Sequence, residues 1–296
     1  MKYPLCFPVY KHRKTTILDR LDGLENPPDK IYCFMYDFDK ENYNLDDYKG
    51  IKNLTIVSVP DEYKSSMKMR LFMQNYLTEQ GVKKFWMLDD DVSNIQVLWK
   101  QENKGHINKV NLTEAYEYIE NYSDENDISL IGPTLSSVKF YWAKGINDFS
   151  GNGMPAGATL INNEKLLSAG VHYTGDASVN EDYEIWINTR RAGLKAGTLD
   201  GVLLKLSETE NGRGSWVANE ANFKIHLNNY LKFGNDFKLF WNEKTDDICA
   251  TRPRGRWVEK ERTWHQGLVD KCHEYLNEKI TKEDFKNYLL NLGKKY

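Results

Sequence analysis

The chain has 296 residues, of which 40% are hydrophobic and 28% are charged, and its formal net charge at pH 7 is −3. This length suits one large domain, or one domain with a substantial extension, and the composition is that of an ordinary globular protein. A slightly acidic chain excludes nucleic-acid binding over its whole surface, so any such contact must come from a local patch of positive charge.

Two features indicate where the protein works. No apolar stretch approaches the roughly 20 residues that cross a membrane, and the N-terminus lacks the pattern of a signal peptide. Cys6 and Cys33 lie in apolar runs and are most simply buried thiols of a reducing compartment. We therefore expect a cytoplasmic protein without a membrane partner.

The chain begins with a predicted strand at residues 3–9, which runs into a basic loop. The strand carries Pro8, and the loop carries Tyr10 and Arg13. A helix is predicted next, over residues 17–24. A cationic loop before a helix N-terminus favours an anionic nucleotide, through its charge and through the free N–H groups of the helix. Pro8, Tyr10 and Arg13 are therefore candidate donor contacts, and a solvated basic turn is the alternative.

A strand–helix–strand alternation follows. Residues 31–36 and 54–59 are apolar runs typical of strands, and residues 66–80 repeat apolar side chains at helical spacing before Gly81. Such an alternation without internal repeats predicts an α/β domain with a mostly parallel, nucleotide-binding sheet.

The next strand ends in three successive carboxylates. Residues 85–88 are apolar, and Asp89, Asp90 and Asp91 follow directly. Because side chains alternate along a strand, Asp89 and Asp91 would project to one side and Asp90 to the other. Carboxylate oxygens suit Mg²⁺ and Mn²⁺, which also bind phosphate oxygens, and α/β folds place ligands at strand ends. The triplet therefore predicts a metal–diphosphate site; the alternative is a solvated acidic turn.

The middle of the chain combines regular elements with a long loop. A helix is predicted over residues 111–122 and a short strand at residues 129–131. Residues 140–154 are rich in Gly, Asn and aromatic residues, including Trp142, and loops of this size are often lids or acceptor-binding surfaces. The small, apolar segment around Gly157 would let the backbone pass close to a ligand. Trp142 and Gly157 are therefore candidate acceptor contacts.

A second acidic group opens a helix predicted to reach Arg191. Glu181 and Asp182 lie in its first turn, where the helix dipole favours negative charge, and the dipole alone would explain acidic residues there. The functional alternative is a catalytic carboxylate held at a rigid helix start. The motif is weak by itself, but it gains weight because it follows the aspartate triplet in the chain.

Two further features lie toward the C-terminus. His226 is flanked by apolar residues, and a histidine in such a place is usually structural. Residues 252–262 hold five cations and two glutamates, a local net charge of +3, and arginines interleaved with Gly and Trp suit phosphate clamping and stacking. Arg252 and Arg254 are candidates for clamping a donor phosphate and Arg256 for contacting an acceptor, with a solvated basic loop as the alternative.

These patterns predict two parts of the chain. Residues 1–245 would form the main α/β domain. Residues 246–296 would form a basic loop and a helical C-terminal extension packed on that domain, because a capping box at Thr281 and Asp284 precedes an apolar helical face.

A strand ending in Asp-x-Asp, a Gly-Ala segment, an Asn-Glu-Asp helix start and a later histidine follow one another in this order. Over residues 3–226 the series resembles the GT-A class of nucleotide-sugar glycosyltransferases. The resemblance implies a Rossmann-like, mostly parallel mixed sheet flanked by helices. The sequence of residues 4–13 also looks like the TET-associated glycosyltransferases of phages, which are proposed to glycosylate hydroxymethylated pyrimidines in DNA.

The resemblance implies a role for each acidic residue of the strand end. Asp89 and Asp91 would bracket Mn²⁺ or Mg²⁺ together with the diphosphate of a nucleotide-sugar donor, most simply a UDP-sugar. Asp89 could instead contact the ribose or the uracil, and because the register is open by one residue, Asp90 is also a candidate donor contact. His226 would match the late histidine that completes the metal site in many members.

The resemblance also implies the catalytic base. In inverting members the acid of the Glu-Asp motif takes the acceptor proton, which assigns this role to Asp182, with Glu181 as the second choice. Retaining members do not need Asp182 in that role, and the sequence leaves inversion and retention open.

The preferred acceptor is 5-hydroxymethylpyrimidine in double-stranded DNA, which would place the protein in the host cytoplasm if a phage encodes it. Other interpretations remain. The acceptor could be a glycan or a protein. A nucleotidyltransferase would also need carboxylates, a metal and a basic clamp. A non-catalytic DNA-binding module could use residues 252–262.

Overall fold

The computed structural model describes residues 1–9, 21, 24–42, 45–90, 92–99, 106–108, 112–134, 149–151, 153–176, 178–206, 220–236, 238–243, 246–251 and 266–293. Most of the helix predicted at residues 17–24 lies outside this set. The chain forms two compact units: one comprises Met1–Gly175 and Glu181–Thr209, and the other comprises Asp176–Asn180 and Glu210–Tyr296. The domain division expected at residue 245 stays a prediction.

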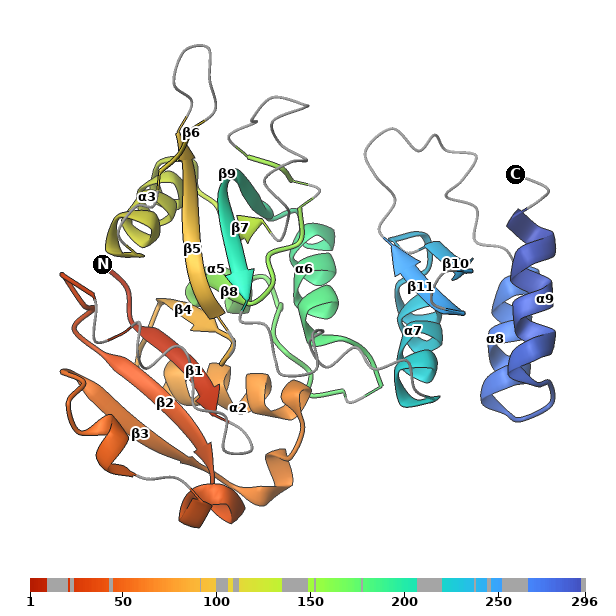
Figure 1. The fold of residues 1–296 in the computed structure, drawn as a ribbon, viewed down its shortest axis with the longest axis horizontal. Coiled ribbons are helices and arrows are strands. Elements are labelled where there is room, and N and C mark those ends of the chain that lie inside the picture. Colours follow the sequence, from red (N-terminus) through yellow and green to blue (C-terminus); the bar gives the residue numbers. More distant parts are fainter. Residues whose placement is uncertain are drawn as a thin grey trace. The chain divides into compact units, whose positions relative to one another are not determined.

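A nine-stranded sheet is the centre of the first unit, with the strand order β3-β2-β1-β4-β8-β7-β9-β5-β6 (Figure 1). In chain order its strands are β1 (Leu5–Val9), β2 (Ile31–Tyr36), β3 (Leu54–Val59), β4 (Lys84–Leu88), β5 (Val92–Trp99), β6 (His106–Asn108), β7 (Leu130–Thr134), β8 (Ala158–Asn162) and β9 (Ala196–Leu206). Neighbours among β1 to β4 pair in parallel, as do β7 and β9. The other pairings are antiparallel. The predicted α/β class with a mixed sheet flanked by helices is confirmed.

The described helices of the first unit are α2 (Ser66–Glu79), α3 (Leu112–Glu125), α5 (Asn163–Ser168) and α6 (Glu181–Arg191), with short 3-10 helices at Asp37–Asn42, Leu45–Tyr48 and Asp61–Tyr63. Local sequence explains the limits of α2. The side chain of Ser65 accepts a hydrogen bond from the N–H of Lys68 at 3.1 Å, which caps the first turn. After the helix the chain turns at Gly81, whose φ of 70° suits glycine.

Successive residues of β2 pack toward different helices. The ring of Phe34 contacts Phe72 and Tyr76 of α2 edge to face. Cys33 instead belongs to the buried cluster that contains Trp86, and the indole of Trp86 meets the ring of Tyr116 on α3 at a centroid distance of 4.8 Å. Because successive side chains of a strand point to opposite faces, α2 and α3 cover opposite faces of the sheet. Inner strands covered on both faces are continuously apolar, which is the pattern that identified β1, β2 and β4.

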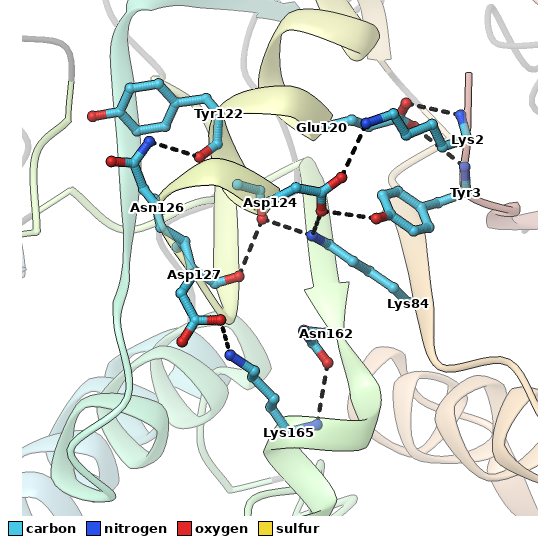
Figure 2. Close-up of polar contacts among 12 residues, drawn as sticks. Lys2, Tyr3, Lys84, Glu120, Tyr122, Asp124, Asn126, Asp127, Asn162 and Lys165 are labelled. Atoms are coloured by element: carbon cyan, nitrogen blue, oxygen red, sulfur yellow. Dashed lines mark hydrogen bonds and ion pairs between the residues drawn. The ribbon is translucent and has the colours of Figure 1, made fainter.

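A network of paired charges ties the start of β4 to α3 (Figure 2). The buried ammonium group of Lys84 donates hydrogen bonds to Ser123 at 2.9 Å and to Asp124 at 2.6 Å. The hydroxyl of Tyr3 donates to Asp124 at 2.7 Å, and the fully buried Glu120 accepts the indole N–H of Trp86 at 2.9 Å. A buried charge is costly unless it is paired, so this network stabilises the amino end of β4.

Ser150 and Gly153 pack very closely against β9. Ser150 and Thr198 form an antiparallel bridge, with N–H to carbonyl distances of 2.8 and 3.0 Å. A Cβ atom added at Gly153 would lie only 1.8 Å from Oγ1 of Thr198. Glycine at this position is therefore required by the close approach of the segment to the strand.

The second unit is built on a two-stranded antiparallel sheet. Its elements are α7 (Glu220–Phe233), a 3-10 helix (Gly234–Asp236), β10 (Lys238–Asn242), β11 (Asp247–Thr251), α8 (Gln266–Leu276) and α9 (Lys282–Gly293). Phe223 of α7 lies at the centre of its core, where its ring contacts Tyr275 and Phe285. The helix predicted after Thr281 is present as α9.

We predict that Gly153→Ala lowers the melting temperature, because the new methyl group must displace Thr198 or the segment around it. Overpacking of this kind costs about 1–3 kcal/mol. Gly50→Ala is the matched control, since a Cβ atom at Gly50 would meet nothing within 4 Å. Thermal unfolding should show a lower midpoint for the first variant alone. Equal midpoints would contradict the close contact.

Candidate active site

The site is organised at the carboxyl end of β4. Asp89 follows the last residue of this strand, and its N–H donates to the carbonyl of Gly157 at 2.7 Å, which continues the pairing of β4 with β8. The carbonyl of Asp89 accepts the N–H of Val92 at 3.4 Å, so Asp90 lies in a turn between β4 and β5. Gly157 has a φ of 73°, which strains a residue with a side chain. The structure therefore places Gly157, a predicted acceptor contact, directly beside Asp89.

Arg70 of α2 holds Asp89 in place. Its buried guanidinium forms an ion pair with the carboxylate of Asp89 and donates to the carbonyl of Leu88 at 3.4 Å. The side chain of Asp89 is still 32% exposed. The carboxylate is thus oriented by one cation while part of it stays accessible to a ligand.

Sequence analysis did not identify Arg70. The helix at residues 66–80 was predicted from the spacing of its apolar residues alone, which include Met69 and Met73. Arg70 and Gln74 are nevertheless among the buried residues of α2. Polar residues at positions that share the buried face of a helix are the signal that could have found them, because such residues are rarely buried without partners.

The acidic pair at the start of α6 interacts with the same guanidinium. Burial, and to a smaller extent the neighbouring carboxylate of Glu181, raise the pKa of Asp182 to about 7 against the opposing charge of Arg70. Burial likewise raises the pKa of the Tyr173 hydroxyl, while Arg70 lowers it and the charges of Asp182 and Glu181 raise it. Arg70 therefore lies close enough to interact with both acidic groups of the site, Asp89 and the α6 pair.

His226 belongs to the second unit, where it lies buried on α7. Burial lowers the pKa of its imidazole, although the carboxylate of Asp247 opposes the shift. The imidazole is consequently neutral at pH 7, the form that binds metal ions. Its predicted part in the metal site stays a prediction.

The other predicted site residues divide into two groups. Pro8 lies in β1, opposite Phe34 of β2, and Asp90 is partly exposed in the turn after β4. The remaining predicted residues fall outside the described part of the chain, and they are Tyr10, Arg13, Asp91, Trp142, Arg252, Arg254 and Arg256.

The described residues do not by themselves form a metal site. Within the described ranges, no three His, Cys, Asp or Glu side chains lie together in a way that could hold a metal ion. The partly exposed carboxylates Asp89 and Asp90 are nevertheless the donors that a hard cation prefers, and Asp91 of the same triplet lies outside those ranges. The donor chemistry thus fits Mg²⁺ or Mn²⁺, with a coordination set that needs further ligands.

None of the helices described is both long and apolar enough to cross a bilayer.

Carboxylates at the end of a central sheet strand, together with an acidic helix start, are typical of α/β proteins that bind ligands at the carboxyl edge of the sheet. The family model of the TET-associated glycosyltransferases matches residues 36–214, which is more than half of the chain. The protein therefore belongs to the TET-associated glycosyltransferase family, and the predicted resemblance and enzyme class are confirmed. The match includes Asp89, Gly157 and Asp182 and ends before His226.

Several solved structures are similar in fold. S. aureus TarS 1–349 is 12% identical, with a TM-score of 0.44, and the similarity covers 69% of this chain and 60% of that one. Its complex with UDP-GlcNAc is 10% identical, with a TM-score of 0.47 and coverage of 78% and 66%. The glycosyltransferase GlyE of Streptococcus pneumoniae TIGR4 is 16% identical, with a TM-score of 0.41 and coverage of 75% and 58%. At such values the similarity adds no argument about substrates. No curated protein matches the chain.

We predict that Asp182→Asn raises thermal stability at pH 8 but not at pH 4. A carboxyl group whose pKa is about 7 in the folded protein and about 4 in the unfolded chain ionises more readily after unfolding. Stability is therefore lost as the pH rises from about 4 to about 7, and asparagine, which does not ionise, avoids this loss. Melting temperatures at the two pH values test the prediction.

Asp176→Asn is the matched control with the opposite sign. Burial alone would raise the pKa of Asp176, but hydrogen bonds from Lys232 and Ser178 lower it to about 2. This aspartate stabilises the fold above the pKa of the unfolded chain, so its asparagine variant should melt lower at pH 8. A stabilising effect of Asp176→Asn, or a pH-independent effect of Asp182→Asn, would contradict the assigned electrostatics.

Proposed function

We propose that the protein transfers a sugar from a UDP-sugar to the hydroxyl of 5-hydroxymethylpyrimidine in double-stranded DNA, in the cytoplasm of a host cell if a phage encodes it. The observation that carries the proposal is the arrangement of two acidic groups about one buried cation. Asp89 is paired with Arg70, and Asp182 interacts with the same guanidinium. A transferase of this kind needs a donor-binding acid and a separate base, and membership of the family supplies the reaction class.

Asp89 and Asp91 would hold Mn²⁺ or Mg²⁺ with the diphosphate of the donor, and His226 would complete the set. Once bound, the cation would neutralise the negative charge that develops on the leaving diphosphate. Arg70 holds the carboxylate of Asp89 in one orientation before the donor arrives. Pro8, Tyr10, Arg13 and Asp90 are proposed donor contacts.

Asp182 is the proposed general base. The acceptor oxygen attacks C1 of the sugar, the bond from C1 to the diphosphate oxygen breaks, and the hydroxyl proton passes to the carboxylate of Asp182. A base is most effective when its pKa is near the working pH, and a pKa of about 7 meets that condition. Glu181 is the second choice for the role. With Asp182 as the base, the proposed reaction inverts the configuration at C1 of the sugar.

The basic segment would contact anions on both substrates. Arg252 and Arg254 would clamp the diphosphate of the donor, and Arg256 would contact DNA together with Trp142 and the backbone at Gly157. Arginine suits both tasks because its guanidinium donates two parallel hydrogen bonds to phosphate.

The first test is a mass-shift assay with pooled UDP-sugars and Mn²⁺. Duplex DNA containing 5-hydroxymethylcytosine or 5-hydroxymethyluracil should gain the mass of one sugar, and unmodified duplex should not. Excess EDTA should abolish transfer. A shift on a glycan or protein acceptor alone would replace the DNA acceptor, a nucleotide adduct would identify a nucleotidyltransferase, and DNA binding without any product would favour a binding module.

We predict that Asp182→Asn lowers kcat by about 10²–10⁴-fold, the range of general-base catalysis, with little change in UDP affinity. A base contributes in the transition state, so its loss appears in kcat. Steady-state kinetics and calorimetric titration with UDP separate the two effects. Asp182 would instead be a donor ligand if UDP affinity fell while bound donor turned over normally.

We predict that Arg254→Gln together with Arg256→Gln flattens the salt dependence of binding to hydroxymethylated duplex, through the loss of Arg256, and lowers UDP affinity, through the loss of Arg254. Each phosphate contact contributes a slope of about −0.9 to log K against log salt. Lys49→Gln with Lys52→Gln removes the same charge at exposed sites and should leave the slope unchanged. Titrations at two salt concentrations, and with UDP, decide the role. A loss of UDP affinity alone would assign these arginines to the donor.

A further inference from the structure

A chain of buried hydrogen bonds joins α2 to the start of α6. The residues that form it belong neither to the aspartate triplet nor to the Glu181–Asp182 pair, and they have no role in the proposed reaction so far. Gln74 lies on α2 one turn after Arg70, and it is fully buried. Its Oε1 accepts the backbone N–H of Tyr173 at 2.9 Å, and its Nε2 donates to Oδ1 of Asn163 at 3.0 Å. Because both ends of the amide have partners, its orientation is fixed.

The second link runs from the same segment into α6. Thr174 donates its hydroxyl to the carboxylate of Glu184 at 2.8–2.9 Å, and its N–H lies 3.3 Å from the same carboxylate. Glu184 is buried in the first turn of α6. A charged acceptor forms stronger hydrogen bonds than a neutral one, so Thr174 and the first turn of α6 are held together.

We propose that Gln74 is a positioning residue for Asp182, because it fixes the segment Tyr173–Thr174, and through it the start of α6, relative to Arg70 and Asp89. Residues four apart on a helix share one face. The same face of α2 therefore holds the carboxylate of Asp89 through Arg70 and the segment before α6 through Gln74. The ring of Tyr173 is buried close enough to Asp182 to interact with its charge. A misplacement of about 1 Å between reacting groups can cost a rate factor near 10². This inference rests on the proposed function for its catalytic consequence.

The test compares Gln74→Met with Asn163→Ala. Methionine keeps the length of the side chain and removes the acceptor for the N–H of Tyr173. Asn163→Ala removes the other hydrogen bond of the same amide, and with it the hydrogen bonds that Asn163 donates to Thr78 and to the carbonyl of Val82. We expect Gln74→Met to lower kcat for sugar transfer about tenfold or more, with the KM for the UDP-sugar changed less than about twofold, and to speed amide hydrogen exchange in residues 173–184. Asn163→Ala should melt at a similarly lowered temperature while kcat and this exchange stay near the wild-type values.

A parallel loss of kcat and melting temperature in both variants would show that Gln74 is only structural. If Gln74→Met does not fold, Thr174→Val removes the second link instead, and a normal kcat in that variant would overturn the proposal. If the wild-type protein transfers no sugar, the proposed function fails separately. Hydrogen exchange then decides the positioning role, because unchanged exchange of residues 173–184 in Gln74→Met or in Thr174→Val would contradict it.

Discussion

The ion pair between Arg70 and Asp89 is the interaction around which the first unit is arranged. A guanidinium removed from water costs several kcal/mol unless opposite charge and hydrogen-bond acceptors surround it, and Arg70 is buried on α2. Asp89 and the carbonyl of Leu88 supply these partners at the end of β4. The helix and the strand end are consequently held at one separation. The same positive charge opposes the rise in the pKa of Asp182. One buried arginine therefore interacts with both acidic groups.

The two ends of β4 carry different kinds of polar contact. At the amino end, Lys84, Glu120 and Asp124 form hydrogen bonds and an ion pair with protein partners, which makes that end a stabilising joint between β4 and α3 (Figure 2). At the carboxyl end Asp89 is only partly enclosed, and Asp182 is held in a state that resists ionisation. Carboxyl groups with a strongly shifted pKa, such as Asp182, are typical of functional sites. Paired charges thus stabilise the amino end of β4, and the proposed chemistry belongs to its carboxyl end.

The sequence predicted those parts of the fold that local pattern determines. Continuous apolar runs identified β1, β2 and β4 because inner strands are buried on both faces. An apolar run also identified the edge strand β3, and helical spacing with Ser65 and Gly81 identified α2. It left β5, β6 and the β10–β11 hairpin unassigned, since antiparallel pairing of such strands depends on partners elsewhere in the chain. Asp89, Gly157 and Asp182 were predicted from their order along the chain. Arg70 and Gln74 were missed, because the prediction of α2 used only its apolar residues, and the contacts of Arg70 and Gln74 with β4 and Tyr173 lie elsewhere in the chain.

The most direct test of this account is a ¹³C NMR titration of the Asp182 carboxyl group in the wild type, in Arg70→Met and in Lys68→Met. Lys68 is an exposed cation of the same helix, so it controls for the lost charge. The account predicts a pKa near 7 in the wild type and in Lys68→Met, and a higher value in Arg70→Met, where the attraction of the guanidinium is lost. A wild-type pKa near the ordinary value of about 4, or an unchanged pKa in Arg70→Met, would contradict the claim that one buried arginine joins the two acidic groups.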